Sequence, residues 1–247
     1  MKCKFEDVEV YYEVFGTGED DTPLVFLHGW GGSTKSFEYF AKAMCSCRKV
    51  VLIDLPPFGN STESKNVWTV EKYAQCVLEI LNQLGAKMCD IVAHSFGGRV
   101  AILLAGKYNI CNRLMLTGCA GINKKSFGTK IKIKLYKIKK ILCKCGLISK
   151  SAIQNKGSED YQSLSPVMKQ TFCNIVNYDE RYLFEKISCP TLLVWGIDDR
   201  ATPFCWTKIF KKHIKDCEII KLTGGHFAYL ENASKFLRIM QSFLANL

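Results

Sequence analysis

The amino-acid sequence predicts an α/β fold built on a mostly parallel, doubly wound sheet. Short continuous apolar runs recur along the chain, and such runs are typical of strands that are buried on both faces of a sheet. Helical patterns separate these runs, most clearly over Val70 to Leu84, where apolar residues repeat at helical spacing. Strands that alternate with helices in this way indicate a doubly wound sheet.

The predicted strands follow one another in a regular order. The first, over residues 8–14, alternates between apolar and polar side chains, and it ends at a turn signal over residues 16–18. Six continuous apolar runs follow, at residues 23–27, 49–53, 88–92, 113–117, 190–195 and 217–222. A chain of 247 residues is long enough to bury one large core and to carry an inserted segment.

The alternation of strands and helices is interrupted once, between about Ala120 and Lys186. This stretch contains helical patterns over residues 165–175 and 179–187. An insertion of this length with its own helical periodicity predicts a small helical lid. We therefore expect a core domain of residues 1–119 and 187–247, with an inserted helical cap (lid) of residues 120–186.

The formal net charge of +11 is concentrated in this insertion. Eleven lysines and no acidic residue lie between Gly121 and Gly157, whereas 23 basic residues face 23 acidic ones in the rest of the chain. The segment fits a basic amphipathic helix, although residues 131–135 also alternate like a strand. Three interpretations stay open: a solvated lid face, which we favour, attraction of anionic substrates, or weak surface contact with anionic lipid. The neutral remainder argues against nucleic-acid binding.

The composition predicts a cytoplasmic protein without a stable membrane anchor. No apolar run approaches the ~20 residues that a membrane-spanning helix needs, and we see no secretory signal behind the basic start of the sequence. The thirteen cysteines are spread through the chain, which favours buried free thiols over a disulfide framework. Their closest spacings match neither zinc nor thioredoxin motifs, so we expect no metal and no cofactor.

The stretch AHSFGG, residues 93–98, is the most specific motif in the sequence. It lies between a predicted strand and a predicted helix, so Ser95 is placed on a sharp turn. Ala93, Gly97 and Gly98 are small enough to tolerate the close contacts of such a turn. This pattern is the small-x-Ser-x-Gly form of a nucleophile elbow, and it predicts that Ser95 is a catalytic nucleophile.

A serine nucleophile needs backbone N–H groups that stabilise the oxyanion formed during attack. One donor is expected to be the amide of Phe96, directly after the nucleophile. The second is expected to be the amide of Trp30 in the glycine-rich loop over residues 28–32, which follows a predicted strand. Trp30 and Phe96 are also expected to line the substrate pocket.

The base that activates the serine is expected to be one of the four histidines. His226 is the best candidate, because it follows the last predicted strand on a loop where glycines let it reach over the sheet edge. His94 adjoins the nucleophile and is expected to point away from it and to pack or hydrogen-bond locally. His28 is expected to brace its glycine loop, and His213 is expected to be solvated among lysines.

The carboxylate that orients the base is expected at the end of another strand. Asp198 and Asp199 both follow the apolar run at residues 190–195, so either could accept a hydrogen bond from the imidazole. Asp54 also ends a strand, and we expect it to hold the turn formed by residues 56–59.

Taken together, these motifs resemble those of the α/β-hydrolase fold superfamily, in its lid-bearing, serine esterase-like branch. The similarity extends over nearly the whole chain. In that family the acid commonly stands three residues after a glycine and four before a proline, which selects Asp199 through Gly196 and Pro203. Two departures, Ala93 and Pro57 where glycines are usual, remove no catalytic atom. The matching stretches are HGWGG (28–32), DLPPFGNS (54–61), AHSFGG (93–98), WGIDDRATP (195–203) and GHFAYLE (225–231).

The resemblance implies a serine hydrolase that cleaves an ester or related acyl bond of a small molecule through an acyl-enzyme. Ser95 would be the nucleophile, His226 the base and Asp199 the orienting acid, in the chain order of this hydrolase class. The same triad would also suit a carbon–carbon bond hydrolase, a thioesterase, a lipase or a perhydrolase. A member of the fold that only binds a small molecule is a further alternative.

Overall fold

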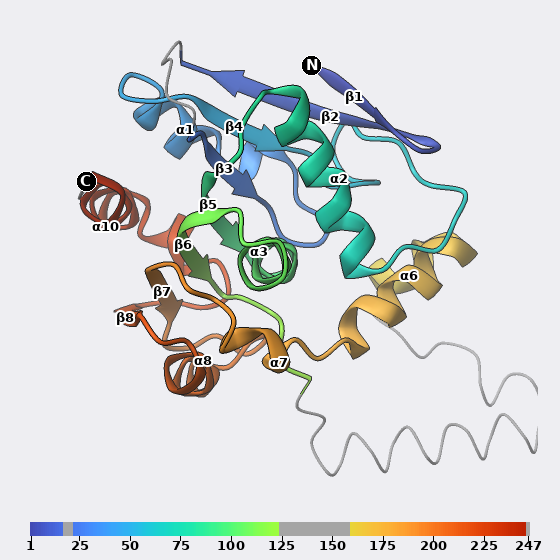
Figure 1. Ribbon diagram of the computed structural model, residues 1–247. Coiled ribbons are helices and arrows are strands. Elements are labelled where there is room, and N and C mark those ends of the chain that lie inside the picture. Colours follow the sequence, from blue (N-terminus) through green and yellow to red (C-terminus); the bar gives the residue numbers. More distant parts are fainter. Residues whose placement is uncertain (17–21, 124–158, 246–247) are drawn as a thin grey trace, which may run out of the picture.

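A computed structural model describes residues 1–16, 22–123 and 159–245, and the described part contains an eight-stranded sheet (Figure 1). The order across the sheet is β1-β2-β4-β3-β5-β6-β7-β8. Strands β1 and β2 run antiparallel to their neighbours, and all the other pairs are parallel. This topology confirms the predicted fold class. The strands are β1 (Lys2–Phe5), β2 (Val8–Phe15), β3 (Leu24–Leu27), β4 (Val50–Ile53), β5 (Cys89–His94), β6 (Cys111–Thr117), β7 (Thr191–Gly196) and β8 (Cys217–Leu222).

All seven predicted strands are present, and β1 is the strand that the sequence did not reveal. It has four residues, two of them lysines, so it lacks an apolar run long enough to stand out. Its place in the sheet depends on pairing with β2, in which Cys3 lies opposite Val10. A strand this short is therefore recognised only from its partner.

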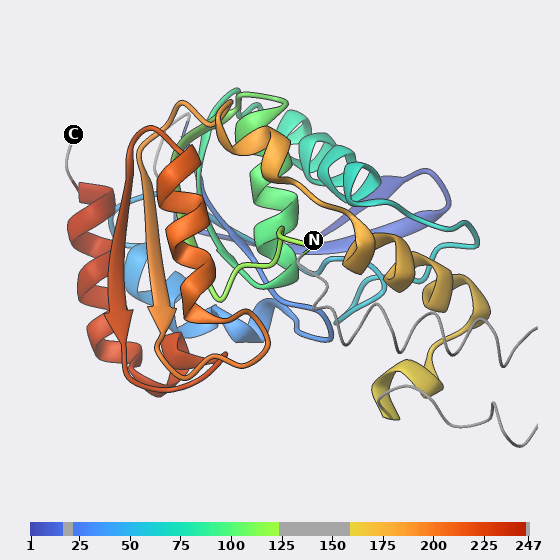
Figure 2. The same cartoon turned by 90° about the horizontal axis from the view of Figure 1, so that it is seen from below.

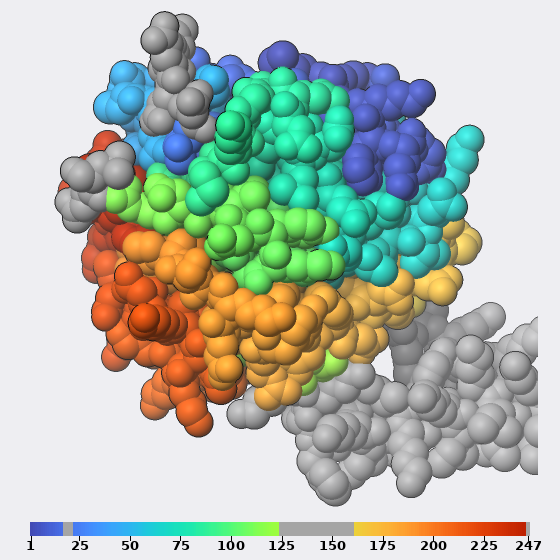
Figure 3. Space-filling view, viewed as in Figure 1, coloured from blue at the N-terminus to red at the C-terminus, as the bar shows by residue number. Residues whose placement is uncertain are grey.

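Helices cover both faces of the sheet. Helix α10 lies on one side of β7 and β8, and α8 lies on the other side (Figure 2). In the space-filling view, α2, α3 and the α7 region lie next to one another and cover one face (Figure 3). The helices are α1 (Glu38–Met44), α2 (Val70–Gln83), α3 (Phe96–Gly106), α5 (Glu159–Ser163), α6 (Pro166–Asn177), α7 (Arg181–Phe184), α8 (Thr207–His213), α9 (Ala228–Glu231) and α10 (Ala233–Ala245), with short 3-10 turns at η1 (Thr34–Ser36) and η3 (Phe204–Trp206).

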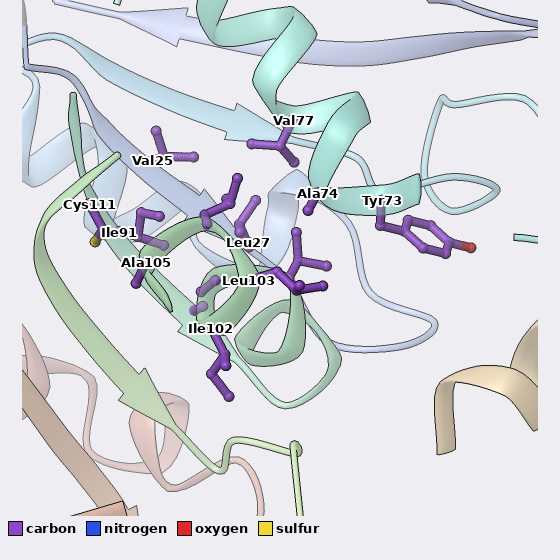
Figure 4. Packing of buried hydrophobic residues seen from close by; sticks show 14 of the residues in the cluster. Val25, Leu27, Tyr73, Ala74, Val77, Ile91, Ile102, Leu103, Ala105 and Cys111 are labelled. Atoms are coloured by element: carbon purple, nitrogen blue, oxygen red, sulfur yellow. The ribbon is translucent and has the colours of Figure 1, made fainter. Parts of the chain in front are cut away.

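The core consists of two clusters, one on each face of the sheet. Side chains of a strand alternate between the faces, so neighbouring residues of β3 belong to different clusters. Val25 belongs to the cluster that also contains Val77 of α2. Figure 4 shows both side chains among the residues of this cluster. Phe26 belongs to the other cluster, where its ring lies 5.0 Å from that of Phe37. The predicted continuous apolar strands are thus buried on both sides.

Local sequence explains where helix α2 begins and why helix α3 is almost entirely apolar. Helix α2 starts after Thr69, whose side chain accepts a hydrogen bond from the Lys72 amide and so caps the helix. Its apolar residues lie on one face, as the sequence predicted. Helix α3 is buried along its whole length between the sheet and its neighbours, which explains why its sequence is almost entirely small and apolar.

The described part of the predicted insertion comprises α5, α6 and α7. The helix predicted over residues 165–175 is confirmed by α6, which Ser165 caps and Pro166 opens. The pattern over 179–187 forms only the four-residue α7, whose Leu183 and Phe184 are buried in the core. The lysine-rich segment, residues 124–158, lies outside the described residues, and the lid boundaries stay a prediction.

Two further features bear on the expected setting of the protein. All eleven cysteines of the described part are free thiols, and seven of them are buried. Within residues 1–16, 22–123 and 159–245, no helix has the length and apolar character required to cross a bilayer.

Candidate active site

Ser95 occupies the sharp turn between β5 and α3. Its backbone has φ of 50° and ψ of −109°, which lies outside the conformations that L-residues prefer. Hydrogen bonds hold the turn, because Ser95 donates its N–H to the Thr117 carbonyl at 3.1 Å and accepts at its own carbonyl from the amides of Gly98 and Ala120, each at 3.1 Å. The turn therefore has the strand–serine–helix form expected of a nucleophile elbow.

Two glycines after the serine let the elbow pack tightly. A Cβ atom on Gly97 would lie 2.3 Å from the carbonyl oxygen of Leu27, and one on Gly98 would lie 2.3 Å from Sγ of Cys119. Neither distance is compatible with a real side chain. The small residues that marked this motif in the sequence are thus required by the packing around Ser95.

The imidazole of His226 lies between Ser95 and Asp199. Its Nε2 atom is 3.0 Å from Oγ of Ser95, and its Nδ1 atom is 2.9 Å from Oδ2 of Asp199. The histidine follows β8 and the aspartate follows β7, so two loops at the same edge of the sheet supply the two groups. The structure therefore brings together three side chains that lie up to 131 residues apart in the sequence.

Asp199 is held in place by a second layer of hydrogen bonds. Its Oδ1 atom accepts from the amides of Ala201 and Thr202, each at 2.9 Å, and its Oδ2 atom accepts from the Thr202 hydroxyl at 2.8 Å. Burial opposes ionisation, but hydrogen bonds from His226 and Thr202 outweigh it and lower the pKa of Asp199. The neighbouring Asp198 is exposed to solvent. Of the two candidate acids, the structure places Asp199 beside His226.

His94 has a contact that the sequence did not reveal. It is buried, and its Nε2 atom lies 3.0 Å from the backbone carbonyl oxygen of His226, to which it can donate a hydrogen bond. Its ring also packs 4.7 Å from the ring of His226 and 4.8 Å from that of Tyr229. Burial lowers the pKa of His94 to about 3, so this histidine stays neutral near pH 7. No local motif indicates a contact between residues 132 positions apart.

The remaining predicted residues lie close to their expected places. The Nδ1 atom of His28 lies 2.7 Å from the Gly29 carbonyl, and its Nε2 atom accepts from the Leu55 amide at 2.9 Å, so His28 does brace the glycine loop. His213 is partly exposed and pairs with Glu185 at 2.9 Å, a partner that the sequence did not show.

Asp54 holds a turn, as the sequence indicated. Its Oδ2 atom accepts a hydrogen bond from the Asn60 amide at 2.8 Å. Its Oδ1 atom accepts from the Thr34 amide at 2.6 Å, which ties the turn to the segment after the glycine loop.

The glycine loop and the elbow lie against each other. A Cβ on Gly29 would lie 3.3 Å from Cβ of Ser95 and 2.8 Å from Nδ1 of His94, so only glycine lets the loop approach this closely. The ring of Trp30 lies 5.4 Å from the ring of Phe96. The Phe96 amide is in the first turn of α3, where backbone N–H groups lack acceptors within the helix.

Two cavities open beside Ser95, and we call them the large cavity and the small cavity. The large cavity has a volume of about 750 Å³, and the small cavity has a volume of about 290 Å³. Among the described residues, the lining of the large cavity is mainly apolar and includes Trp30, Phe96, Phe172, Ile175 and Trp206. The small cavity is lined by the glycine loop, Ser36, His94, Ser95, His226, Phe227 and Tyr229.

A buried ion pair lies at the edge of the large cavity. The Nη1 atom of Arg99, on α3, donates to Oε2 of Glu180 at 3.1 Å and to the carbonyl oxygen of Tyr178 at 2.7 Å. The glutamate side chain is fully buried, and burial raises its pKa, although the charge of Arg99 opposes that shift. The pair connects α3 to the segment that precedes α7.

Comparison with known proteins agrees with this architecture. A family described as alpha/beta hydrolase fold matches residues 22–132. An uncharacterized hydrolase, YugF of Bacillus subtilis, is 29% identical over 219 residues, which cover 80% of each chain. The sn-1-specific diacylglycerol lipase ABHD11 of Danio rerio is 38% identical over 112 residues, which cover 44% of this chain and 35% of the lipase. An enol-lactonase from Burkholderia xenovorans superposes with a TM-score of 0.78 at 17% identity, with all of both chains covered.

The fold, the strand–serine–helix turn and these similarities define the class of the protein. The chain has the α/β-hydrolase fold. The two similar proteins YugF and ABHD11 are named as a hydrolase and a lipase.

Proposed function

We propose that this protein is a serine hydrolase that cleaves an ester or related acyl bond of a small molecule. The observation that carries the proposal is the position of the His226 ring, with one nitrogen 3.0 Å from the Ser95 hydroxyl and the other 2.9 Å from the Asp199 carboxylate. A serine hydroxyl attacks an acyl carbon only when a base takes its proton, and this geometry supplies that base.

In the proposed reaction, Ser95 Oγ bonds to the carbonyl carbon while His226 Nε2 takes the hydroxyl proton. The amides of Trp30 and Phe96 are assigned as donors to the oxyanion that forms. The tetrahedral intermediate then loses its leaving group, which takes the proton from Nε2, and Ser95 remains acylated. A water molecule attacks the acyl-enzyme in the same way, and the acid departs. Asp199 accepts a hydrogen bond from Nδ1 throughout and stabilises the imidazolium.

Two observations favour ester chemistry over the other reactions that the same three residues could perform. The large cavity beside Ser95 is apolar, which suits an acyl chain. The names of two similar proteins, a diacylglycerol lipase and an enol-lactonase, both denote cleavage of an ester bond.

A cytoplasmic setting is part of the proposal, supported by the free thiols of the described cysteines. An inserted lid over residues 120–186 also remains part of it.

The proposal is tested by Ser95→Ala, with Ser46→Ala as a matched control at an exposed serine. We expect Ser95→Ala to lower kcat for p-nitrophenyl acetate by about 10⁴-fold or more, because the substitution removes the nucleophile. Its circular dichroism and melting temperature should match those of the unmodified protein. A fluorophosphonate probe should label the unmodified protein and Ser46→Ala, and should not label Ser95→Ala. Full activity of Ser95→Ala, or no labelling of the folded protein, would contradict the assignment and favour a binding role.

A further inference from the structure

The large cavity and the small cavity meet at the nucleophile. Ser95 and Trp30 line both of them. In the part of the chain that the structure describes, His226 and Phe227 line the small cavity and not the large one. The base therefore lies on one side of the nucleophile, and the two sides are chemically different.

The position of the base decides which part of an ester lies on which side. When the tetrahedral intermediate collapses, the leaving oxygen takes the proton from His226 Nε2, so it must lie within hydrogen-bond reach of that atom. The water that later attacks the acyl-enzyme gives its proton to the same nitrogen. The leaving group and then the water should therefore occupy the small cavity. The acyl chain stays on Ser95 while the water enters, so it needs the large cavity.

The two cavities also differ in size and in lining. The large cavity, at about 750 Å³, has more than twice the volume of the small one, at about 290 Å³. Phe172, Ile175 and Trp206 contribute apolar surface to the large cavity. The small cavity is bordered by the glycine loop over residues 29–32, by Ser36 and by the rings of Phe227 and Tyr229. An extended alkyl group fits the large cavity better, and a short group fits the small one better.

We infer that the substrate is an ester with a long apolar acyl group and a small leaving group, such as the methyl ester of a medium-chain fatty acid. The inference rests on the proposed serine-hydrolase function and adds the direction in which the ester binds. An ester with the opposite arrangement, a short acyl group and a long alcohol, would have to place its alkyl chain beside His226, where there is less room.

Methyl octanoate and heptyl acetate provide a direct test, because they are isomers and differ only in which side of the ester bond bears the long chain. Each is supplied to the full-length protein below its solubility limit, and acid release is followed by titration at constant pH. We expect kcat/KM to be at least about tenfold higher for methyl octanoate, since a buried alkyl chain in a fitting pocket contributes about that much or more.

Two neighbouring substitutions relate the preference to the small cavity. Phe227→Ala removes a half-exposed ring (52% exposed) from that cavity and should shift the kcat/KM ratio at least about threefold toward heptyl acetate. Leu230→Ala is the matched control, because Leu230 is similarly exposed (47%) and lies in neither cavity's described lining. It should keep the ratio of the unmodified protein.

The possible failures are distinguishable. Equal rates for the two isomers, a preference for heptyl acetate, or the same ratio in Phe227→Ala and Leu230→Ala would overturn the inference and leave the serine mechanism intact. Cleavage of neither isomer by a protein whose Ser95 still reacts with a fluorophosphonate would also overturn it. Absence of both labelling and ester turnover would instead remove the proposed function on which it rests.

Discussion

Two buried polar regions border the large cavity, and they differ in the groups that their hydrogen bonds join. In the first, the Asp199 carboxylate and the His226 ring are aligned on the hydroxyl of Ser95, which opens to both cavities. In the second, the Arg99 guanidinium binds Oε2 of Glu180 and a backbone carbonyl, while Oε1 of Glu180 is buried without a hydrogen-bond partner among the described residues. Both regions join segments that are far apart in the sequence. Only the first ends on a hydroxyl that could attack a bound substrate.

The difference between the two regions shows how to separate chemistry from stability. Where hydrogen-bonded side chains end on a reactive hydroxyl, removal of one of them should lower the activity of the protein with little change in its fold. Where two buried charged side chains bind each other, removal of one should lower the free energy of unfolding of the protein, because the other stays buried without its partner. Three substitutions, in decreasing order of expected effect, test this distinction.

The largest effect is expected for Asp199→Asn, which keeps the shape of the side chain and removes its charge. The amide cannot hold His226 in the tautomer that accepts the serine proton, so we expect kcat for p-nitrophenyl acetate to fall by about 10³–10⁴-fold. Asp198→Asn is the matched control, because Asp198 is the adjacent, exposed aspartate. If the two variants lost activity equally, Asp199 would not be the orienting acid.

A smaller effect, on stability, is expected for Arg99→Met. Without Arg99, the buried Glu180 must either keep its charge in apolar surroundings or take up a proton, and the free energy of unfolding should fall by about 3–5 kcal/mol. Urea denaturation measures this loss. The double substitution Arg99→Met with Glu180→Leu should recover much of it, and Arg238→Met, at an exposed arginine, should cost little. A loss below about 1 kcal/mol for the single variant would show that the pair is not an important contributor.

The smallest effect is expected for the pH dependence of stability in His94→Gln. Burial lowers the pKa of His94 from about 6.5 to about 3, so the unfolded chain binds a proton between these values that the folded protein does not bind. The resulting stabilisation is complete above pH 6.5 and is lost as the pH falls, at up to about 1.4 kcal/mol per pH unit. Glutamine cannot titrate, so the slope between pH 6.5 and 5 should decrease in this variant.

Urea midpoints at several pH values measure that slope. Burial also lowers the pKa of His28, so part of the dependence should remain in His94→Gln. An unchanged slope in His94→Gln would mean that His94 does not contribute to the pH dependence of stability as expected.

Local motifs explain why so much of the site could be predicted. The turn at Ser95 is encoded within six consecutive residues, because the glycines after it are needed for contacts with the adjacent strand and loop. The parallel strands are short apolar runs, and the loops that follow them meet at one edge of the sheet. His226 and Asp199 each follow such a strand, so the fold class predicts that a histidine and an acid meet near Ser95, and the family resemblance selects Asp199 over Asp198.

Contacts between distant segments explain what could not be predicted. The bond between Arg99 and Glu180 joins positions 81 residues apart, and the sequence could place Arg99 on a helix without showing what it faces. The bond from His94 to the His226 carbonyl spans 132 residues and depends on how the end of β5 packs against the loop after β8. The two cavities depend on side chains from many elements, so neither their sizes nor the position of His226 beside the small one is visible in any single motif.

Helix α6 borders the large cavity through Phe172 and Ile175, yet it contributes none of the three proposed catalytic side chains. The proposed nucleophile, base and orienting acid lie on turns and loops that follow strands of the sheet. Under the proposed function, rate and chain-length preference would therefore be set by separate parts of the polypeptide. Redesign of one helix would then resize the proposed acyl cavity and leave the proposed catalytic residues unchanged.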